Sequence, residues 1–337
     1  MKKLNSAIIG CGSIASMHEA AILSCHNANL YAVCDIDSSK TLEMKQKHRC
    51  QVFSQYQELL ESDTIDVVHI CTPHYLHAPM AIEAMKAGKH VLTEKPMAIS
   101  VSDALEMVRV SKQTGRMLGV SFQNRFNNTS RRVKEILNTG KTGRVLGARA
   151  FITWHRGAEY YSRDKWRGKW ETEGGGLLIN QAIHTLDLLQ WFMGDIDTIK
   201  ASIDTRLLKN VIEVEDTAEA TIKFKSGATA FFYATNGYPL DSVVMLEIVC
   251  EKAVIRMEGG VTIKYSNGDI EHILDDEKAK GEKVYWGCGH KTLVHDFYKK
   301  LLEGQHFELD GNEALKAIKI VNAMYVSHKI KDYVEVG

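Results

Sequence analysis

The chain has 337 residues, of which 45% are hydrophobic, and it carries 42 Lys or Arg against 42 Asp or Glu residues. This length exceeds what one hydrophobic core usually serves, so we expect two domains, each with its own core. The balanced charge excludes the bulk electrostatic attraction that nucleic acids and anionic membranes exert on a basic protein, which favours a small-molecule partner.

Short apolar runs alternate with longer segments of helical periodicity in the first part of the chain. The runs are residues 4–9, 30–34, 67–70, 90–92 and 117–120. The segments between them space apolar residues three and four apart, as helices with one buried side do, and Gly88 and Gly115 are placed to end two of them. This alternation predicts a doubly wound parallel sheet, of the α/β class, in a domain that spans residues 1–122.

The pattern changes after residue 122. Four later segments alternate apolar and polar residues as strands of an antiparallel sheet do: residues 217–224, 228–233, 243–249 and 254–257. Helical periodicity returns over three others: residues 177–192, 292–302 and 313–325. We therefore expect residues 123–337 to form an α+β domain with a large, mostly antiparallel sheet.

The first apolar run leads into a glycine loop with the sequence GCGSIA. Its glycines allow the backbone to turn tightly and to approach a pyrophosphate at the N-terminus of the next helix, while the small Ala15 permits close helix packing. The residues expected at the coenzyme are Gly10, Gly12, Ser13 and Ile14. The pattern predicts a dinucleotide site of the Rossmann type; the alternative is a tight strand-to-helix turn without a ligand.

Asp35 ends the second predicted strand, twenty residues after Ala15. A carboxylate at this place accepts hydrogen bonds from the ribose hydroxyls of NAD and repels the additional phosphate of NADP. Ile36 offers no cation for that phosphate, so we expect NAD as the coenzyme. The alternative is an ordinary turn or cap residue ahead of Asp37.

Two further motifs give the chain a resemblance to a known family. One covers residues 71–96 and ends in the tripeptide EKP, and the other, residues 173–187, reads EGGGLLINQAIHTLD. With the glycine loop, these motifs resemble the Gfo/Idh/MocA family of sugar oxidoreductases over nearly the whole chain, most firmly over residues 4–195. The resemblance implies a Rossmann domain followed by a domain that binds the substrate and assembles subunits.

The resemblance assigns the catalytic positions, facing the nicotinamide and the substrate hydroxyl, to Lys95 and His184. Oxidation of a secondary alcohol sends a hydride to the nicotinamide while a base takes the hydroxyl proton, and a histidine with an ordinary pKa near ~6.5 suits that base. The Lys95 ammonium then stabilises the developing alkoxide. The two roles are open to exchange or to a shared proton relay. Either version requires the ammonium and the imidazole to converge on the reacting carbon.

Many members of the family carry an aspartate four residues before this histidine, where the present chain has Asn180. An amide orients a partner but does not titrate. One helical turn separates Asn180 from His184, so we expect Asn180 to bond a substrate hydroxyl or the imidazole. The alternative is that Asn180 caps the helix and that His184 is an ordinary core histidine.

The resemblance also places five residues at the coenzyme: Thr72, Pro73, His77, Glu94 and Lys95. It further implies a cis peptide bond before Pro96. We expect Gln123 at the coenzyme and Arg125 at the substrate, because both lie at the predicted domain junction. A surface hinge is the alternative for these two residues.

Aromatic and arginine residues crowd residues 154–170, ahead of the triple glycine. Aromatic rings stack on sugar faces, and arginine forks bind carboxylate or phosphate, so this composition suits an acidic or phosphorylated sugar. The residues expected at the substrate are Trp154, Arg156, Trp166 and Arg167. The alternative, which is compatible with the first, is a loop that packs at a subunit contact.

The sequence predicts neither a metal site nor a disulfide framework. His74 and His77 have i, i+3 spacing, but acidic or thiol partners do not cluster near them. The seven cysteines form no C-x-x-C pair, which indicates small buried hydrophobes of a reducing compartment. No apolar run approaches the roughly 18 residues of a membrane span, and the stretch after Lys3 is too short for a secretory signal. We therefore expect a cytoplasmic protein.

These features predict an NAD-dependent oxidoreductase that transfers a hydride between nicotinamide and a secondary carbinol of a cyclic polyol, sugar or sugar derivative. Two other functions stay open: an NAD-binding regulator without turnover, and an NAD-dependent glycosidase that oxidises its substrate transiently. Retention of both Lys95 and His184 argues against the regulator. By resemblance, the sheet of the second domain assembles the chain into a homodimer or homotetramer.

Overall fold

The computed structural model describes residues 3–274 and 289–337, which form two compact units. Unit 1 comprises Met1–Gln123 and Gly289–Leu315, and unit 2 comprises Asn124–Cys288 and Lys316–Gly337. The first boundary lies one residue past the predicted one. Gly289–Leu315 also belong to unit 1, whereas the predicted division assigned these residues to the second domain.

Unit 1 is built on a six-stranded sheet with the order β3-β2-β1-β4-β5-β6, in which every neighbouring pair is parallel. Its strands are β1 (Leu4–Ile9), β2 (Ala28–Cys34), β3 (Gln51–Phe53), β4 (Val67–Ile70), β5 (His90–Glu94) and β6 (Leu118–Ser121). The doubly wound parallel sheet is therefore confirmed. The strand order reverses between β1 and β4, and open α/β sheets bind ligands beyond the carboxyl ends of strands at such a reversal.

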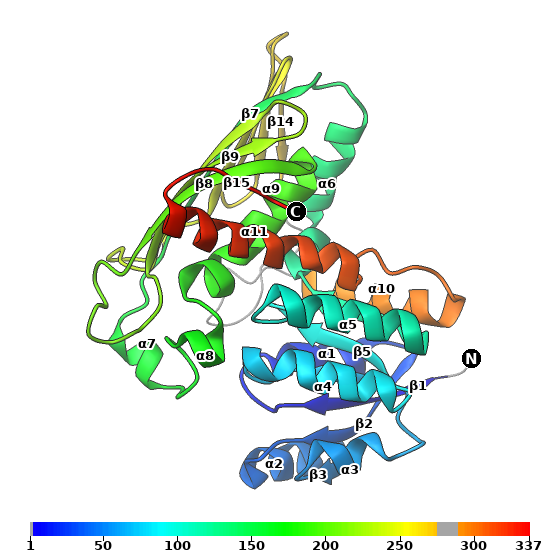
Figure 1. Ribbon diagram of the computed structural model, residues 1–337. Coiled ribbons are helices and arrows are strands. Elements are labelled where there is room, and N and C mark those ends of the chain that lie inside the picture. The colour runs from blue at the N-terminus through cyan, green and yellow to red at the C-terminus, as the bar shows by residue number, and fades with distance from the viewer. Residues whose placement is uncertain (1–2, 275–288) are drawn as a thin grey trace. The chain divides into compact units, whose positions relative to one another are not determined.

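Six helices surround this sheet: α1 (Ala15–Ser24), α2 (Ser38–His48), α3 (Tyr56–Leu60), α4 (His74–Lys86), α5 (Val101–Thr114) and α10 (Gly289–Glu303). The chain runs outward from β1 toward β3 in one half of the sheet and outward from β4 toward β6 in the other. Because the crossovers between parallel strands are right-handed, α1 lies on one face of the sheet and α4 and α5 lie on the other. α4 packs beside α5 (Figure 1), and α10 packs beside α1. The helix predicted at residues 292–302 is therefore present as α10, but it belongs to the first unit.

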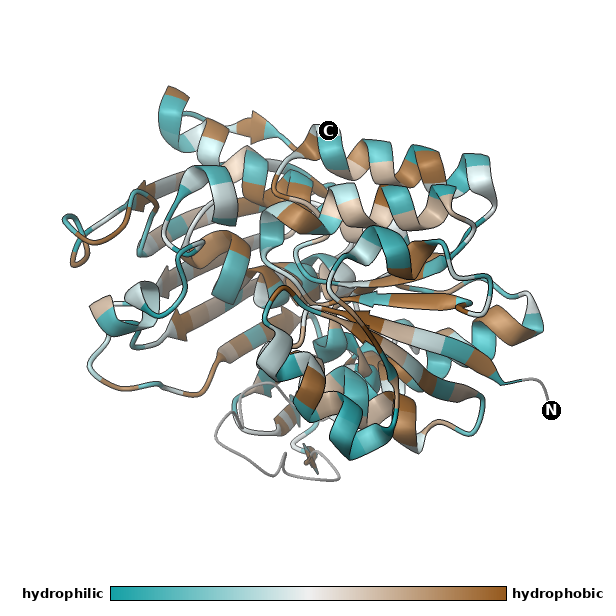
Figure 2. Cartoon of the chain, turned by 90° about the horizontal axis from the view of Figure 1, so that it is seen from below, coloured by the Kyte–Doolittle hydropathy of each residue, from teal (hydrophilic) through white to brown (hydrophobic). Residues whose placement is uncertain are grey.

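Local chemistry explains where α5 begins and ends. The Ser100 side chain accepts a hydrogen bond from the backbone N–H of Asp103 at 3.1 Å, and Gly115 ends the helix in the left-handed region with φ of 65°. Gly88, with φ of 81°, follows α4 in the same way. Brown and teal residues alternate along the helices in Figure 2, as expected where one side is buried.

Unit 2 is built on a nine-stranded sheet with the order β14-β13-β12-β11-β7-β10-β9-β8-β15. Its strands are β7 (Val145–Thr153), β8 (Ile196–Asp204), β9 (Thr217–Phe224), β10 (Thr229–Thr235), β11 (Met245–Cys250), β12 (Ala253–Met257), β13 (Val261–Tyr265), β14 (Ile270–Ile273) and β15 (Val334–Glu335). Only β7 and β10 pair in parallel among these neighbours. This confirms a large, mostly antiparallel sheet.

The helices of unit 2 include α6 (Asn128–Asn138), α7 (Ala158–Ser162), α8 (Trp170–Glu173), α9 (Ile183–Met193) and most of α11 (Gly311–Ile330). A 3-10 turn, Gln123–Phe126, crosses the boundary between the units. The helix predicted at residues 177–192 begins as a π-helical turn, Leu178–Ala182, and continues as α9. Turns of this kind are frequent at functional sites.

Six cysteines within the described residues are free, and all of them except the half-buried Cys11 are buried. Cys288 lies outside the described residues. In residues 3–274 and 289–337, no helix has the length and apolar character that crossing a bilayer requires.

Candidate active site

The glycine loop follows β1 at the carboxyl edge of the unit 1 sheet. Gly10 has φ of 90°, and a Cβ atom there would lie 2.7 Å from the carbonyl oxygen of Cys71, so only glycine fits between these strands. Gly12 has open space around it, and both Gly12 and Ser13 are exposed. Ala15 is buried where α1 begins. The loop thus presents accessible backbone at a helix N-terminus, as a pyrophosphate requires.

Asp35 lies beside this loop because β1 and β2 are neighbours in the sheet. Its Oδ2 accepts a hydrogen bond from the backbone N–H of Cys11 at 2.7 Å, and its Oδ1 accepts one from Asp37 at 2.9 Å. Each carboxylate oxygen retains acceptor capacity for a further donor, such as a ribose hydroxyl. These residues fit a bound dinucleotide.

His77 connects two turns at the same edge of the sheet. One ring nitrogen lies 2.8 Å from the carbonyl oxygen of Thr72, and the other lies 2.7 Å from that of Pro96. The peptide bond between Lys95 and Pro96 is cis, as expected. Both ring nitrogens of His77 are therefore engaged by the backbone, and no group of three His, Cys, Asp or Glu side chains suited to a metal occurs among the described residues.

Glu94 ends β5 and is buried, whereas the next residue, Lys95, is half-buried. Glu94 Oε1 lies 2.9 Å from the Nε2 atom of His18, and Oε2 accepts a long hydrogen bond of 3.3 Å from the backbone N–H of Lys95. Glu94, which we expect at the coenzyme, thus makes its observed contacts inside unit 1. Gln123, the other residue expected at the coenzyme, is also buried.

In unit 2, the buried Glu215 carboxylate holds the start of the π turn. It accepts hydrogen bonds from the backbone N–H groups of Gly176 and Leu178 at 3.0 and 2.8 Å, and the Tyr325 hydroxyl donates a further one at 3.0 Å. Burial raises the pKa of Glu215 to about 7, although these donors act in the opposite direction. Glu215 thus contacts the backbone at the start of the segment that carries His184.

Asn180 lies in the π turn, and His184 is half-buried in the first turn of α9. The Asn180 amide donates to Glu173 Oε1 at 2.6 Å, inside the unit. Asn180 lies in π-helical backbone and His184 in α-helical backbone, so one regular α-helical turn does not relate the two side chains. Whether either side chain contacts a substrate stays a prediction.

The Tyr160 hydroxyl joins the arginine-rich loop to the π turn. The Nδ2 atom of Asn180 lies 3.4 Å from it, the Nε2 atom of Gln181 lies 3.2 Å from it, and Arg167 donates to it as well. The Arg167 guanidinium also lies over the rings of Tyr160 and Trp166, at 4.6 and 4.4 Å from their centroids. Residues expected in two separate motifs therefore belong to one cluster.

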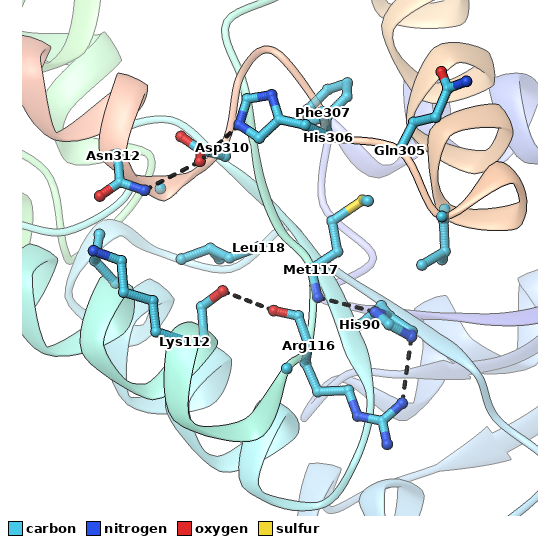
Figure 3. A pocket seen from close by; sticks show the side chains of 16 residues that line it. His90, Lys112, Arg116, Met117, Leu118, Gln305, His306, Phe307, Asp310 and Asn312 are labelled. Atoms are coloured by element: carbon cyan, nitrogen blue, oxygen red, sulfur yellow. Dashed lines mark hydrogen bonds and ion pairs between the residues drawn. The ribbon is translucent and has the colours of Figure 1, made fainter.

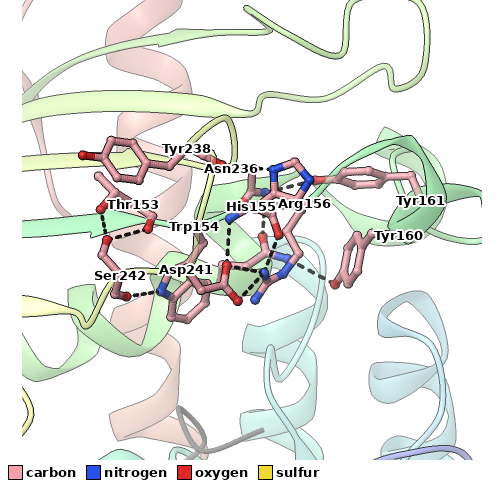
Figure 4. A network of polar contacts seen from close by, with 11 residues as sticks. Thr153, Trp154, His155, Arg156, Tyr160, Tyr161, Asn236, Tyr238, Asp241 and Ser242 are labelled. Atoms are coloured by element: carbon pink, nitrogen blue, oxygen red, sulfur yellow. Dashed lines mark hydrogen bonds and ion pairs between the residues drawn. The ribbon is translucent and has the colours of Figure 1, made fainter. Parts of the chain in front are cut away.

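Trp154 and Arg156 follow β7 and belong to a network of polar contacts (Figure 4). The Trp154 indole donates to the carbonyl oxygen of Ser242 at 3.0 Å, and Arg156 forms an ion pair of 2.8 Å with Asp241. The Arg156 guanidinium lies 5.1 Å from the Trp154 ring centroid. Both side chains are nearly buried, so the network fixes their orientation.

Arg125 is placed differently from the other residues expected at the substrate. Its side chain is 2% exposed and forms a two-pronged ion pair with Asp187, at 2.8 and 2.6 Å. The guanidinium also lies 5.3 Å from the ring centroid of Trp191. Because these contacts hold Arg125 in the interior of unit 2, we leave it out of the proposed substrate residues.

Sequence reasoning did not select Tyr160, Glu173, Glu215 or Asp241. Tyr160 stands in the aromatic stretch, so its composition gave a signal. Asp241 lies 85 residues from Arg156, and only the folded sheet brings the two together. Glu215 lies 37 residues from Leu178 and offers no local pattern.

A cavity of about 450 Å³ lies at the opposite edge of the unit 1 sheet, where β5 and β6 begin (Figure 3). The backbone N–H of Met117 donates to His90 at 3.0 Å, and His306 lies 3.0 Å from Asp310. None of the residues expected at the coenzyme or the substrate lines it. This cavity is therefore distinct from the edge that carries the glycine loop.

Two family models match the chain. Residues 4–122 match the oxidoreductase family with an NAD-binding Rossmann fold, and residues 130–256 match the GFO/IDH/MocA C-terminal domain.

Solved and curated proteins agree with these matches. The structure of the WlbA dehydrogenase from Chromobacterium violaceum, in complex with NADH and UDP-GlcNAcA, is 32% identical, covers 99% of this chain and 96% of its own, and gives a TM-score of 0.86. The corresponding complex from Bordetella pertussis is 30% identical, covers 99% of each chain and gives 0.87. Myo-inositol 2-dehydrogenase of Thermotoga maritima is 28% identical over 66% of this chain and 65% of its own length. The chain therefore belongs to the GFO/IDH/MocA family and is an oxidoreductase whose Rossmann domain takes NAD as coenzyme.

Proposed function

We propose that this chain is a dehydrogenase that oxidises a secondary carbinol of an anionic sugar derivative, with sugar acids linked to a nucleotide as its preferred substrates. The observation that carries the proposal is the cluster in which Arg167 stacks on Tyr160 and Trp166 next to Asn180. Such a cluster offers aromatic rings for a sugar and, in Arg167, a guanidinium for carboxylate or phosphate, with one of its nitrogens paired to Asp164 at 2.8 Å. Two relatives that are at least 30% identical were solved with UDP-GlcNAcA, which combines these features.

The chemistry assigned to the chain's own residues follows from the oxidation of an alcohol. The carbinol hydroxyl gives its proton to the imidazole of His184, and the Lys95 ammonium stabilises the negative charge that develops on the carbinol oxygen. NAD, which the glycine loop and Asp35 would hold, would supply the acceptor for the hydride of the carbinol carbon. Charge and electrons balance, because the products are a ketone, NADH and one proton.

The test is a spectrophotometric assay with NAD and a matched panel of substrates. The panel contains a UDP-linked sugar acid, the corresponding neutral UDP-sugar, the free sugar acid and myo-inositol. We expect NADH absorbance to rise with the first compound at the highest kcat/KM. Higher kcat/KM with myo-inositol or the neutral sugar would contradict the anionic preference. NAD binding without any turnover would favour the regulator, and sugar release without net NADH would favour the glycosidase.

The cytoplasmic location and the homodimer or homotetramer expected from the sequence are part of the same proposal. Size-exclusion chromatography with light scattering tests the second point, and a monomeric mass at micromolar concentration would contradict it.

A further inference from the structure

A line of hydrogen-bonded polar side chains crosses the interior of unit 1. His18 on α1, His69 on β4 and Tyr298 on α10 are fully buried, and Glu94 at the end of β5 is 6% exposed. His18 Nε2 lies 2.9 Å from Glu94 Oε1, and His18 Nδ1 lies 2.8 Å from His69 Nδ1. His69 Nε2 lies 2.7 Å from the Tyr298 hydroxyl, which in turn contacts the Ser6 hydroxyl. The line therefore links four elements to the turn that carries Lys95.

The contact between the two Nδ1 atoms restricts the protons in this line, because only one of the atoms donates. An ionised Glu94 accepts only, so His18 Nε2 carries a proton. If His18 Nδ1 also donates, His18 is an imidazolium, and His69 is neutral and donates to Tyr298. If His69 donates instead, His18 is neutral and Tyr298 donates to His69. The two arrangements differ by one proton on His18.

The surrounding groups favour the imidazolium. Burial opposes a charge on His18, but its interactions with the neighbouring Cys71 sulfur and the Glu94 carboxylate raise the pKa of His18 above its ordinary value. The pKa of His69 is lowered, first by burial and then by the charge of His18. The Nε2 atom of His290 on α10 lies 3.8 Å from Glu94 Oε1. Burial lowers the pKa of His290 to about 4, so this histidine stays neutral.

Glu94 is the link between this buried cation and the surface of the site. One carboxylate oxygen contacts His18 and the other accepts the backbone N–H of Lys95. Burial acts to raise the pKa of Glu94, but the His18 imidazolium and the nearby Lys95 ammonium lower it below its ordinary value. Three ionisable groups, His18, His290 and Lys95, thus surround one buried carboxylate.

We propose that His18 is a positioning residue for the Lys95 turn: as an imidazolium donating to both Glu94 and His69, it fixes the Glu94 carboxylate and through it the backbone of Lys95. This inference rests on the proposed catalytic role of Lys95. A buried carboxylate without this partner is costly, so it moves or takes up a proton when His18 is lost, and the Lys95 turn is then released.

The first test observes the proton directly. Histidine labelled with ¹⁵N in the full chain is expected to show the His18 ring as an imidazolium with both nitrogens protonated at pH 8, where solvent-exposed histidines are neutral. Its signal is expected to disappear in His18→Gln and to become that of a neutral ring in Glu94→Gln. Absence of a buried imidazolium in the wild-type protein, or its persistence in Glu94→Gln, overturns the proposal.

The second test uses two substitutions at one position. A glutamine amide reaches the place of the histidine Nε2 atom and keeps a donor for Glu94, whereas an asparagine amide reaches only the place of Nδ1. We expect His18→Asn to lower kcat at least about tenfold, because small displacements of a reacting group have effects of this order, and His18→Gln to recover most of that loss. Equal losses in the two variants overturn the proposal, because mere packing of α1 would be lost in both.

The matched control is His295→Gln. His295 lies on α10 and contacts Ser24 and the carbonyl oxygen of Ala21 on α1, so it joins the same two helices outside the line. We expect its kcat to equal that of the wild type. Lys95→Ala separates the two hypotheses. If this variant stays active while the wild type shows the imidazolium signal, the proposed role of Lys95 fails. If the variant loses activity but the wild type shows no imidazolium signal, the His18 inference fails and the role of Lys95 stands.

Discussion

The Asp35 carboxylate accepts a hydrogen bond from the backbone N–H of Cys11, with 2.7 Å between the two atoms. The bond joins the end of β2 to the glycine loop after β1, so a fixed negative charge stands beside the backbone that fits a pyrophosphate. The position of the residue that we expect to select the coenzyme is therefore set by the pairing of two parallel strands.

Asp35→Ala is expected to weaken NAD binding about tenfold, or about 1.4 kcal/mol, because the ribose hydroxyls lose their acceptor. NADP binding should weaken less, since its extra phosphate also loses a repelling charge. Titration calorimetry with both coenzymes measures this difference. Asp35→Asn is the matched control, because it keeps an oxygen for the Cys11 N–H while removing the charge. Equal weakening of NAD and NADP in Asp35→Ala would rule out Asp35 as the ribose acceptor.

Lys95→Ala is expected to lower kcat by about 10²-fold or more, the usual effect of removing an electrostatic stabiliser of the transition state. The Kd for NAD should change much less, because the glycine loop and Asp35 lie on other strands. Steady-state kinetics and coenzyme titration on the same preparation separate the two effects. Lys86→Ala, at an exposed position near the end of α4, serves as the control. A loss of less than about threefold would remove Lys95 from the chemical step.

The parts of the site that local sequence determines were predictable. The glycine loop, Asp35 and the turn at Lys95 each follow one strand directly, so an apolar run and the residues after it are sufficient to place them at the carboxyl edge of the sheet. The cis bond before Pro96 followed from the resemblance of the same short motif.

The parts that depend on contacts distant in sequence were not predictable. Periodicity indicated a helix near residues 292–302, but it does not say which sheet that helix covers, and α10 proved to pack on α1. The π turn is held by Glu215, which comes from the segment before β9. An arginine at the domain junction is typical of a binding residue, so the sequence favoured a substrate role for Arg125. Its ion-pair partner, Asp187, lies 62 residues away, so the buried ion pair could not be predicted from local sequence.

Asn180→Asp is expected to place a second carboxylate 2.6 Å from the buried Glu173. Two carboxylates this close cannot both ionise, so the pKa of one of them rises. Because that folded-state pKa lies above the unfolded value, the variant should lose stability as pH rises from about 5 to 8, and its kcat should gain a new pH-dependent limb. Denaturant unfolding and kcat profiles over this range provide the measurement. The double variant Asn180→Asp with Glu173→Gln should restore the wild-type pH dependence of both stability and kcat. A single variant with the same pH profiles as the wild type would contradict the expectation.

Glu215→Gln tests whether the contact that begins the π turn is sensitive to pH. Burial raises the pKa of Glu215 to about 7, above its ordinary value of 4.5, so the native state holds a proton that the unfolded state has released. The wild type should therefore lose stability as pH rises from 4.5 through 7, by on the order of 3 kcal/mol. A glutamine retains an oxygen for Gly176 and Leu178 but does not titrate, so the variant should show no such loss.

The free energies of unfolding of Glu215→Gln and wild type are thus expected to differ more at pH 8 than at pH 5, in favour of the variant. Glu213→Gln is the matched control, because it removes an exposed carboxylate two residues away and should follow the wild-type curve at every pH. A constant difference between Glu215→Gln and wild type from pH 5 to 8 would mean that Glu215 stays ionised in the folded protein. In that case the three donors around the carboxylate outweigh its burial, and the π turn is held equally firmly across the pH range in which His184 is proposed to act.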